Sequence, residues 1–173
     1  SNMNTKQKYP MSMIFFHGLL AVLMIATLVV AWMMDDNKDL MPLHKSLGAT
    51  VFIFGILRIL NRMSNMAKLP PSVNHGALHW VEKAVHGLLM LVMLALPFVG
   101  WLMSNAKGYQ VSVFGLFNLP TLIAKNEPLA HTLKEMHETG ANVFVALLVL
   151  HVVGVVYHKV KTKDDVLSRM SPF

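Results

Sequence analysis

The stretch MSMIFFHGLLAVLMIATLVVAWMM, residues 11–34, carries no formal charge and only one strongly polar side chain, His17. As an α-helix it is about 36 Å long, which exceeds the roughly 30 Å hydrocarbon core of a bilayer. It is too long for a typical signal peptide and lacks an A-x-A cleavage pattern. We therefore expect a membrane-spanning helix. Ser1 and Asn2 precede Met3 and are interpreted as the remnant of a tag, so the fold is read from Met3 onward.

Three further apolar stretches follow in the sequence. Two polar connections that contain Pro and Gly, residues 63–78 and 104–130, separate these three stretches from one another. We predict one domain over residues 3–173, an all-α integral membrane four-helix bundle. The predicted helices cover about 11–34, 44–62, 80–103 and 132–158. The longest connection, residues 104–130, contains an apolar VSVFGLF segment that we expect at the membrane surface.

The composition excludes several classes of protein. Of the side chains, 54% are hydrophobic and 14% are charged, whereas an ordinary soluble domain has about 25% charged residues. The chain has no cysteine, which excludes disulfides, thiolate metal sites, iron–sulfur clusters and covalently attached c-type haem. No basic face of a soluble domain accompanies the net charge of +6, so no nucleic-acid partner is expected.

Lysine and arginine are unevenly divided between the two sides of the predicted bundle. We name the side of the N-terminus side A and the opposite side B. Side A carries Lys6, Lys8, Arg58, Arg62, Lys68, Lys83, Lys159, Lys161, Lys163 and Arg169, and side B carries Lys38, Lys45, Lys107, Lys125 and Lys134. The positive-inside rule then predicts a multi-pass protein of the bacterial inner membrane with both termini in the cytoplasm.

Four histidines lie at matching depths in the predicted helices. His17 lies near side A, and His44 opens the second helix near side B. His137 is near side B, and His151 lies fourteen residues further on, about 21 Å closer to side A and on the same helix face. Depth therefore pairs His17 with His151 and His44 with His137.

Two pairs of facing histidines at two depths indicate two haem b groups with bis-histidine ligation. Haem iron binds imidazole nitrogens on opposite faces of the macrocycle, and the core of a bundle provides the slot. Gly48 and Gly87 would let a flat macrocycle approach the backbone. Possible contacts for the haem propionates are Arg58, Arg62 and His86.

Other interpretations remain open for these residues. A buried histidine can be a hydrogen-bonding residue without a metal. Arg58 and Arg62 can simply be the positive residues that the positive-inside rule places at the cytoplasmic end of a membrane helix. Zinc is the rival metal, with the i,i+4 pair His75 and His79 as its possible ligands. His158 lies seven residues beyond His151, so it is either an interfacial residue or a hydrogen-bond partner for a quinone beside the cytoplasmic haem.

An ordered set of motifs resembles the prokaryotic cytochrome b561 family over nearly the whole chain. The matching features are His17, H-K-S-L-G at 44–48, R-x-x-x-R at 58–62, H-x10-P at 86–97, F-G-L at 114–116, H-E-T at 137–139, and L-H at 150–151 followed by His158. The resemblance implies four core helices and two haem b groups with axial ligands from the first, second and fourth helices. In that pattern His86 does not match a ligand position.

Within that family the chain resembles the members that oxidise superoxide and pass the electron to ubiquinone. This implies an oxidoreductase with ubiquinone as electron acceptor and superoxide as donor, for which Lys45, Lys107, Lys125 and Lys134 are candidate steering residues. The alternative is a haem b membrane anchor and electron conduit for a separate redox partner protein. A transporter without haem would leave the histidine geometry unexplained.

Overall fold

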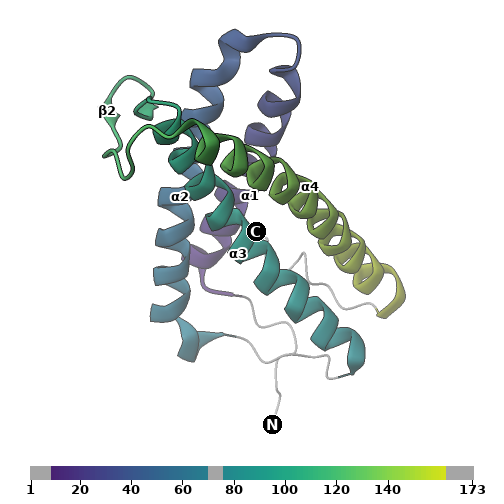
Figure 1. Cartoon of the computed structure of the whole chain (residues 1–173). Coiled ribbons are helices and arrows are strands. Elements are labelled where there is room, and N and C mark those ends of the chain that lie inside the picture. The colour runs from purple at the N-terminus through teal and green to yellow at the C-terminus, as the bar shows by residue number, and fades with distance from the viewer. Residues whose placement is uncertain (1–8, 70–75, 163–173) are drawn as a thin grey trace.

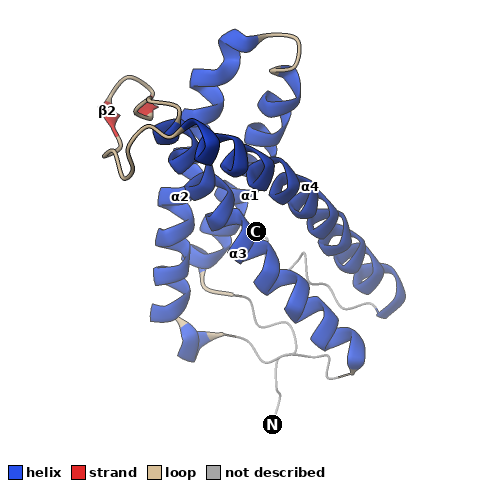
Figure 2. Ribbon diagram, in the orientation of Figure 1, coloured by secondary structure: helices blue, strands red, loops and turns tan. Residues whose placement is uncertain are grey.

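Four long antiparallel helices form the molecule in a computed structural model, which describes residues 9–69 and 76–162 (Figures 1 and 2). The helices are α1 (Met11–Met33), α2 (Met41–Ser64), α3 (Ala77–Ala106) and α4 (Glu127–Tyr157), and a π-helical turn over His158–Thr162 extends α4. Short 3-10 turns over Lys38–Leu40 and Met66–Lys68 flank α2. All four helices are long and apolar enough to cross a membrane. The predicted all-α membrane bundle is confirmed.

Prolines in the first helical turn explain why two helices begin earlier than predicted. Helix α4 starts at Glu127 rather than near residue 132, because the Asn126 side chain accepts a hydrogen bond from Leu129 N and Pro128 occupies the first turn. Helix α2 likewise starts at Met41 with Pro42 in its first turn. A proline there loses no helical hydrogen bond, since the first amides of a helix have no partner within it. These prolines act as helix starts and not as loop breakers.

The helices pack in the order α1, α2, α3, α4, with the closest packing between α3 and α4. Residues from all four helices meet in one apolar core, which contains Leu20, Met24, Val51, Leu89, Met93, Leu96 and Phe144. Within the described ranges, neither α1 nor α2 packs closely along α4. In the part of the chain that the structure describes, α4 therefore packs mainly on α3, and α1 mainly on α2.

Much of the apolar surface faces outward, as a bilayer requires. In the most apolar window of α4 only 6% of the residues are buried, against 33% in α1. Large apolar side chains such as Val22, Leu91 and Val152 are more than half exposed. Trp32 and Trp80 lie exposed near opposite ends of the bundle, where aromatic residues favour the membrane–water interface.

A small hairpin on side B was not predicted. Strands β1 (Ser112–Val113) and β2 (Phe117–Asn118) pair antiparallel around a turn in which Leu116 N donates to Val113 O over 2.9 Å. Phe114 and Gly115 have φ values of 53° and 70°, a turn geometry that glycine adopts readily and phenylalanine rarely. Two-residue strands of this kind are too short for an alternating pattern to reveal them in the sequence.

Candidate haem-binding sites

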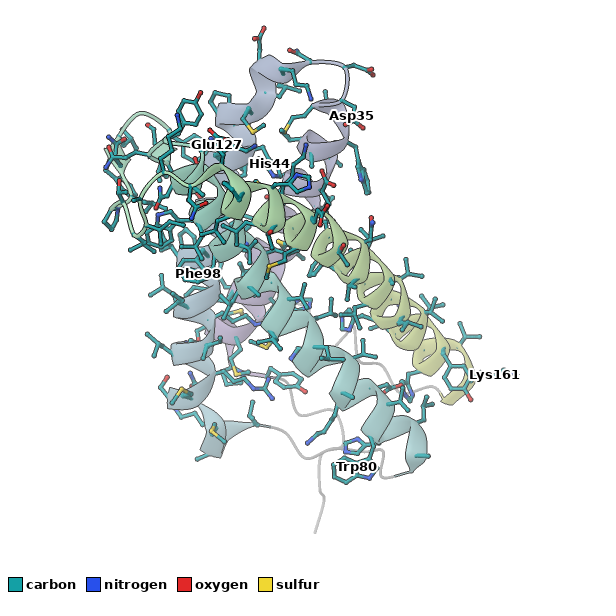
Figure 3. All side chains as sticks on the ribbon, in the orientation of Figure 1. Asp35, His44, Trp80, Phe98, Glu127 and Lys161 are labelled. Atoms are coloured by element: carbon teal, nitrogen blue, oxygen red, sulfur yellow. The ribbon has the colours of Figure 1, made fainter. Side chains whose placement is uncertain are left out.

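His44 and His137 face each other near side B. His44 lies in the first turn of α2, at the end of the molecule that also carries Asp35 and Glu127 and opposite Trp80 and Lys161 (Figure 3). Its ring centre lies 6.3 Å from that of His137 on α4, and the ring planes are nearly perpendicular at 85°. We call this pair the side B site.

In each imidazole of the side B site, the ring nitrogen Nδ1 hydrogen bonds to a backbone carbonyl oxygen. His44 Nδ1 donates to Thr27 O over 3.2 Å, and His137 Nδ1 donates to Leu96 O over 3.1 Å. Because a carbonyl oxygen only accepts, both rings carry the proton on Nδ1 and a lone pair on Nε2. Metal-binding histidines in proteins are oriented by this same kind of contact.

The side B site fits a metal held between two imidazoles. With metal–nitrogen bonds of about 2 Å, two imidazoles bound to opposite sides of one ion have ring centres roughly 6 Å apart. The observed 6.3 Å matches this value. The donor set therefore suits haem iron, which takes two axial nitrogen ligands.

Small residues give each imidazole access to its carbonyl. One turn beyond Leu96 lies Gly100, where an added Cβ would come within 3.3 Å of His137 Cε1. Ala31 occupies the equivalent place one turn beyond Thr27. An added Cβ at Gly48 would lie 4.0 Å from Pro97 Cβ, so this glycine lies at the contact between α2 and α3.

On side A the structure brings together more groups than one ligand pair. The rings of His86 on α3 and His151 on α4 have centres 6.3 Å apart and planes tilted by 38°. Arg58 of α2 interacts electrostatically with both of them and with His17 of α1. Arg62 adds a second cation beside His86. We call these five residues the side A cluster.

His86 and His151 lie at the interface between α3 and α4. These two helices also contact each other nearer to side A and nearer to side B than the two histidines. Toward side A, Glu82 of α3 contacts His158 just beyond α4. Toward side B, a Cβ on Gly140 of α4 would come within 2.8 Å of Leu96 Cδ2. A flat macrocycle needs more separation between the helices than this close packing provides. Open space does lie beside Gly87, where an added Cβ would meet nothing within 4 Å.

Arg58 and Arg62 place two positive charges in the bundle, and in the described ranges neither forms an ion pair with a carboxylate. Both side chains are partly buried. Partly buried cations in a membrane protein usually pair with an anion. The two arginines therefore suit a ligand with carboxylates, such as the propionates of haem.

His158 is buried, with only 3% of its surface exposed, and its Nε2 contacts the carboxylate of Glu82. It is therefore not an open interfacial side chain. The sequence reasoning missed Glu82, although it is the sole acidic residue in α3 and an acid inside a membrane helix is by default a functional residue. Gly154, one turn before His158, leaves room for Glu82.

The side B lysines differ in how strongly they are engaged. Lys45 Nζ donates to Ser104 Oγ over 3.0 Å and lies 5.5 Å from the centre of the Tyr109 ring, with Lys107 as an electrostatic neighbour. Lys125 lies 3.8 Å from the carboxylate of Glu127, and both side chains are largely exposed. Lys134 is exposed on α4.

The suggested zinc ligands receive no structural support as a pair. His75 lies outside the described residues, and His79 packs against the Trp80 ring.

Replacing Gly100 with alanine should disturb the side B site. The added methyl group presses on His137 and displaces its ring by a few tenths of an ångström, which weakens the hydrogen bond to Leu96 O. Changes in such orienting contacts typically reduce metal affinity about 10–100-fold. We expect Gly100→Ala to retain less haem than wild type, measured as the haem-to-protein ratio. Gly18→Ala is the matched control, because an added Cβ there meets nothing within 4 Å and the position is exposed on α1. Equal haem retention in both variants would contradict the proposed ligand role of His137.

Comparison with known proteins supports the same conclusion as the geometry. The family model for the prokaryotic cytochrome b561 matches residues 8–173. "Cytochrome b561 homolog 2" of Escherichia coli K12 is 29% identical over 174 residues, covering 96% of this chain and 93% of the relative. "Cytochrome b561 homolog 1" of the same organism is 31% identical over 125 residues, covering 70% of this chain and 68% of the relative. The chain belongs to the prokaryotic cytochrome b561 family, whose members bind haem b and transfer electrons across a bacterial membrane.

Proposed function

We propose that this chain holds two haem b groups and passes electrons from the periplasmic face to ubiquinone at the cytoplasmic face. The observation that carries the proposal is the side B site, where two imidazoles face each other at 6.3 Å with Nδ1 of each held by a carbonyl. When bound, haem b supplies an iron that takes up and releases one electron.

We assign His44 and His137 as axial ligands on side B and His17 and His151 on side A. Bis-histidine ligation keeps two ligand helices apart, so the ligands should come from helices that do not pack directly. Helices α1 and α4 meet this condition, whereas α3 and α4 are the most closely packed pair. His17 is therefore favoured over His86 as the partner of His151, although the centres of the His86 and His151 rings lie 6.3 Å apart, the same distance as in the side B site.

Arg58, Arg62 and His86 hold the propionates in this proposal. The two guanidinium groups offset the two negative charges of the macrocycle, and bidentate contacts between guanidinium and carboxylate are strong. His86 adds a ring nitrogen at the same depth as Arg58.

The two haem sites should be lost separately. His17→Ala or His151→Ala should empty the side A site and spare the other, and His44→Ala or His137→Ala should do the reverse. We expect each variant to keep about half of the wild-type haem, measured by reduced-minus-oxidised spectra and EPR. His86→Ala is the critical comparison, because losing a propionate contact should weaken haem binding on side A without emptying the site. Loss of the side A haem in His86→Ala with retention in His17→Ala would overturn the assignment.

Side A is proposed to face the cytoplasm, because ten of the fifteen lysines and arginines lie there. A C-terminal fusion should then be active with a reporter that requires the cytoplasm and inactive with one that requires export. The opposite pattern would reverse the proposed direction of electron transfer.

Superoxide is the proposed donor. Each superoxide anion gives one electron and leaves as oxygen, and two electrons with two protons convert ubiquinone to ubiquinol. Lys45 and Lys107 form a positive group next to His44 that attracts an anion locally. Side B as a whole is not positive, because its five lysines, which include Lys125 and Lys134, face six carboxylates: Asp35, Asp36, Asp39, Glu127, Glu135 and Glu138. Enzymatically generated superoxide should reduce the purified haem protein, and a soluble ubiquinone analogue should reoxidise it. Failure of the first step with a working second step would favour the conduit role for a separate redox partner protein.

Glu82 and His158 are proposed to deliver protons to the quinone on side A. A carboxylate and an imidazole in contact can hold and pass a proton, and quinone reduction consumes protons as well as electrons. The pair links α3 to the end of α4, at the cytoplasmic side in the proposed orientation.

We expect Glu82→Gln and His158→Ala to keep both haems and to slow reoxidation by the quinone on the order of tenfold or more. Stopped-flow absorbance measures the rate. His131 and Glu135 provide the control, because they form an exposed pair with a 3.1 Å contact near the other end of α4. Wild-type rates in both Glu82→Gln and His158→Ala, each with full haem content, would assign the pair to structure alone.

A further inference from the structure

The segment YQVSVFGLFNLPTLIA, residues 109–124, joins α3 to α4 on side B and contains no Asp, Glu, Lys or Arg. It nevertheless exposes large apolar and aromatic side chains. These are Tyr109 (62% exposed), Phe114 (51%), Leu116 (82%), Phe117 (49%) and Leu122 (46%). An exposed apolar surface of this kind marks contact with a membrane or another protein.

The other connection on side B has the opposite character. Residues 35–39 read DDNKD, and all five are exposed. The exposed side chains of residues 35–39 are polar or charged and favour contact with water, whereas the exposed side chains of residues 109–124 are mainly apolar. Both connections lie at the same end of the bundle, so the contrast reflects different surroundings for the two segments.

Helix side chains satisfy much of the hairpin backbone. Ser46 Oγ donates to Ser112 O over 3.2 Å and accepts from Phe114 N over 2.9 Å. Asn105, which is 2% exposed, donates to Tyr109 O and accepts from Leu122 N. Trp101 Nε1 donates to Pro120 O. Pairing of this extent is unnecessary for a loop in water but favourable for a backbone that lies near hydrocarbon.

The anchor at Ser46 places the hairpin at the depth of the membrane interface. Ser46 lies five residues inside the start of α2 at Met41, which corresponds to about 7.5 Å along the helix axis. Helix α2, at 24 residues, is about 36 Å long and exceeds a hydrocarbon core of about 30 Å by roughly 3 Å at each end. By these figures Ser46 lies about 4.5 Å on the hydrocarbon side of the boundary with the headgroups. The hairpin projects sideways from the bundle at this level (Figure 1).

The hairpin also continues a surface of α2 that faces outward. Val111 and Val113 pack on Ala49, one turn from Ser46. Ile53 and Leu57, the next residues along that stripe, are 36% and 41% exposed. These two side chains face the bilayer in a membrane-spanning helix, so the hairpin lies on the lipid-facing side of α2.

We propose that residues 109–124 form a hairpin inserted into the side B leaflet, with lipid as the partner of its apolar tip. The polar side chains Gln110 and Asn118 hydrogen bond to each other over 3.2 Å and give the hairpin a polar edge for the headgroups. The aromatic residues of the segment suit the interface. The inserted hairpin would fix the depth of α2 and of the His44 that opens it.

Single-cysteine labelling tests the proposal directly, because the chain has no native cysteine. A nitroxide is attached at Leu116→Cys, and at Phe117→Cys as a second position, in the haem-loaded protein reconstituted in phosphatidylcholine and phosphatidylglycerol vesicles. Two matched labels calibrate the measurement: Asp36→Cys on the exposed connection of the same side, and Leu91→Cys on a 63% exposed position in the middle of α3. EPR power saturation compares collisions with oxygen, which concentrates in lipid, and with a water-soluble nickel complex.

We expect the ratio of oxygen to nickel collisions at both hairpin positions to exceed that at Asp36 severalfold and to approach that at Leu91. A ratio equal to that at Asp36 would place the hairpin in water and overturn the proposal. Low collision rates with both reagents would show that protein covers the tip, most simply a second copy of the chain, and would equally overturn it. An unchanged haem spectrum in each labelled variant confirms that the fold is intact.

Discussion

The bundle is organised by the absence of water from the bilayer core, which forces each polar group in a membrane helix to find a partner inside the protein. Within the described ranges, no buried side-chain nitrogen or oxygen lacks a hydrogen-bond partner. This constraint explains why the Nδ1 atoms of His44 and His137 are hydrogen bonded to the carbonyls of Thr27 and Leu96. The same contacts leave Nε2 of each imidazole free of the carbonyl, and the two ring centres lie 6.3 Å apart, so the need to satisfy a buried polar atom also prepares a ligand site.

Helix packing divides the molecule in a way that follows from the same requirement. Helices α1 and α2 form one consolidated pair and α3 and α4 another, with α2 against α3 between them. Helix α4 carries His137 and His151 but has the smallest share of residues buried by protein. A haem protein of this family gains part of its core from the cofactor, so a bound haem and the surrounding lipid would together account for the few protein contacts of α4. Arg58 and Arg62, which have no carboxylate partner in the described ranges, are suited to the propionates of a haem on side A.

Much of the fold was predictable because depth in a membrane depends on position along a helix. Hydropathy predicted four spans, and the fourteen-residue interval from His137 to His151 predicted two levels on one helix face. Rotation of one helix against another was not predictable, and it decides which side chains meet. His86 therefore came to lie beside His151, and Glu82 beside His158, although both were foreseeable as unusual residues in an apolar helix. The hairpin escaped prediction because its stability depends on Ser46, Asn105 and Trp101, which are distant in sequence.

The two ends of the bundle offer different chemistry, and the difference fits the proposed direction of electron transfer. Near side B the Lys45 ammonium is held by Ser104 and flanked by Lys107. A cation of this kind attracts an anion but does not exchange protons readily near neutral pH. The carboxylate of Glu138 acts on His137, and the His131–Glu135 pair of that side is exposed. Near side A the carboxylate of Glu82 meets the imidazole of His158, a combination suited to proton exchange. One-electron oxidation of superoxide releases no proton, whereas reduction of a quinone to a quinol consumes two. An acid–base pair is therefore needed only at the proposed quinone end, where the His158 side chain is buried and the Glu82 side chain is 33% exposed.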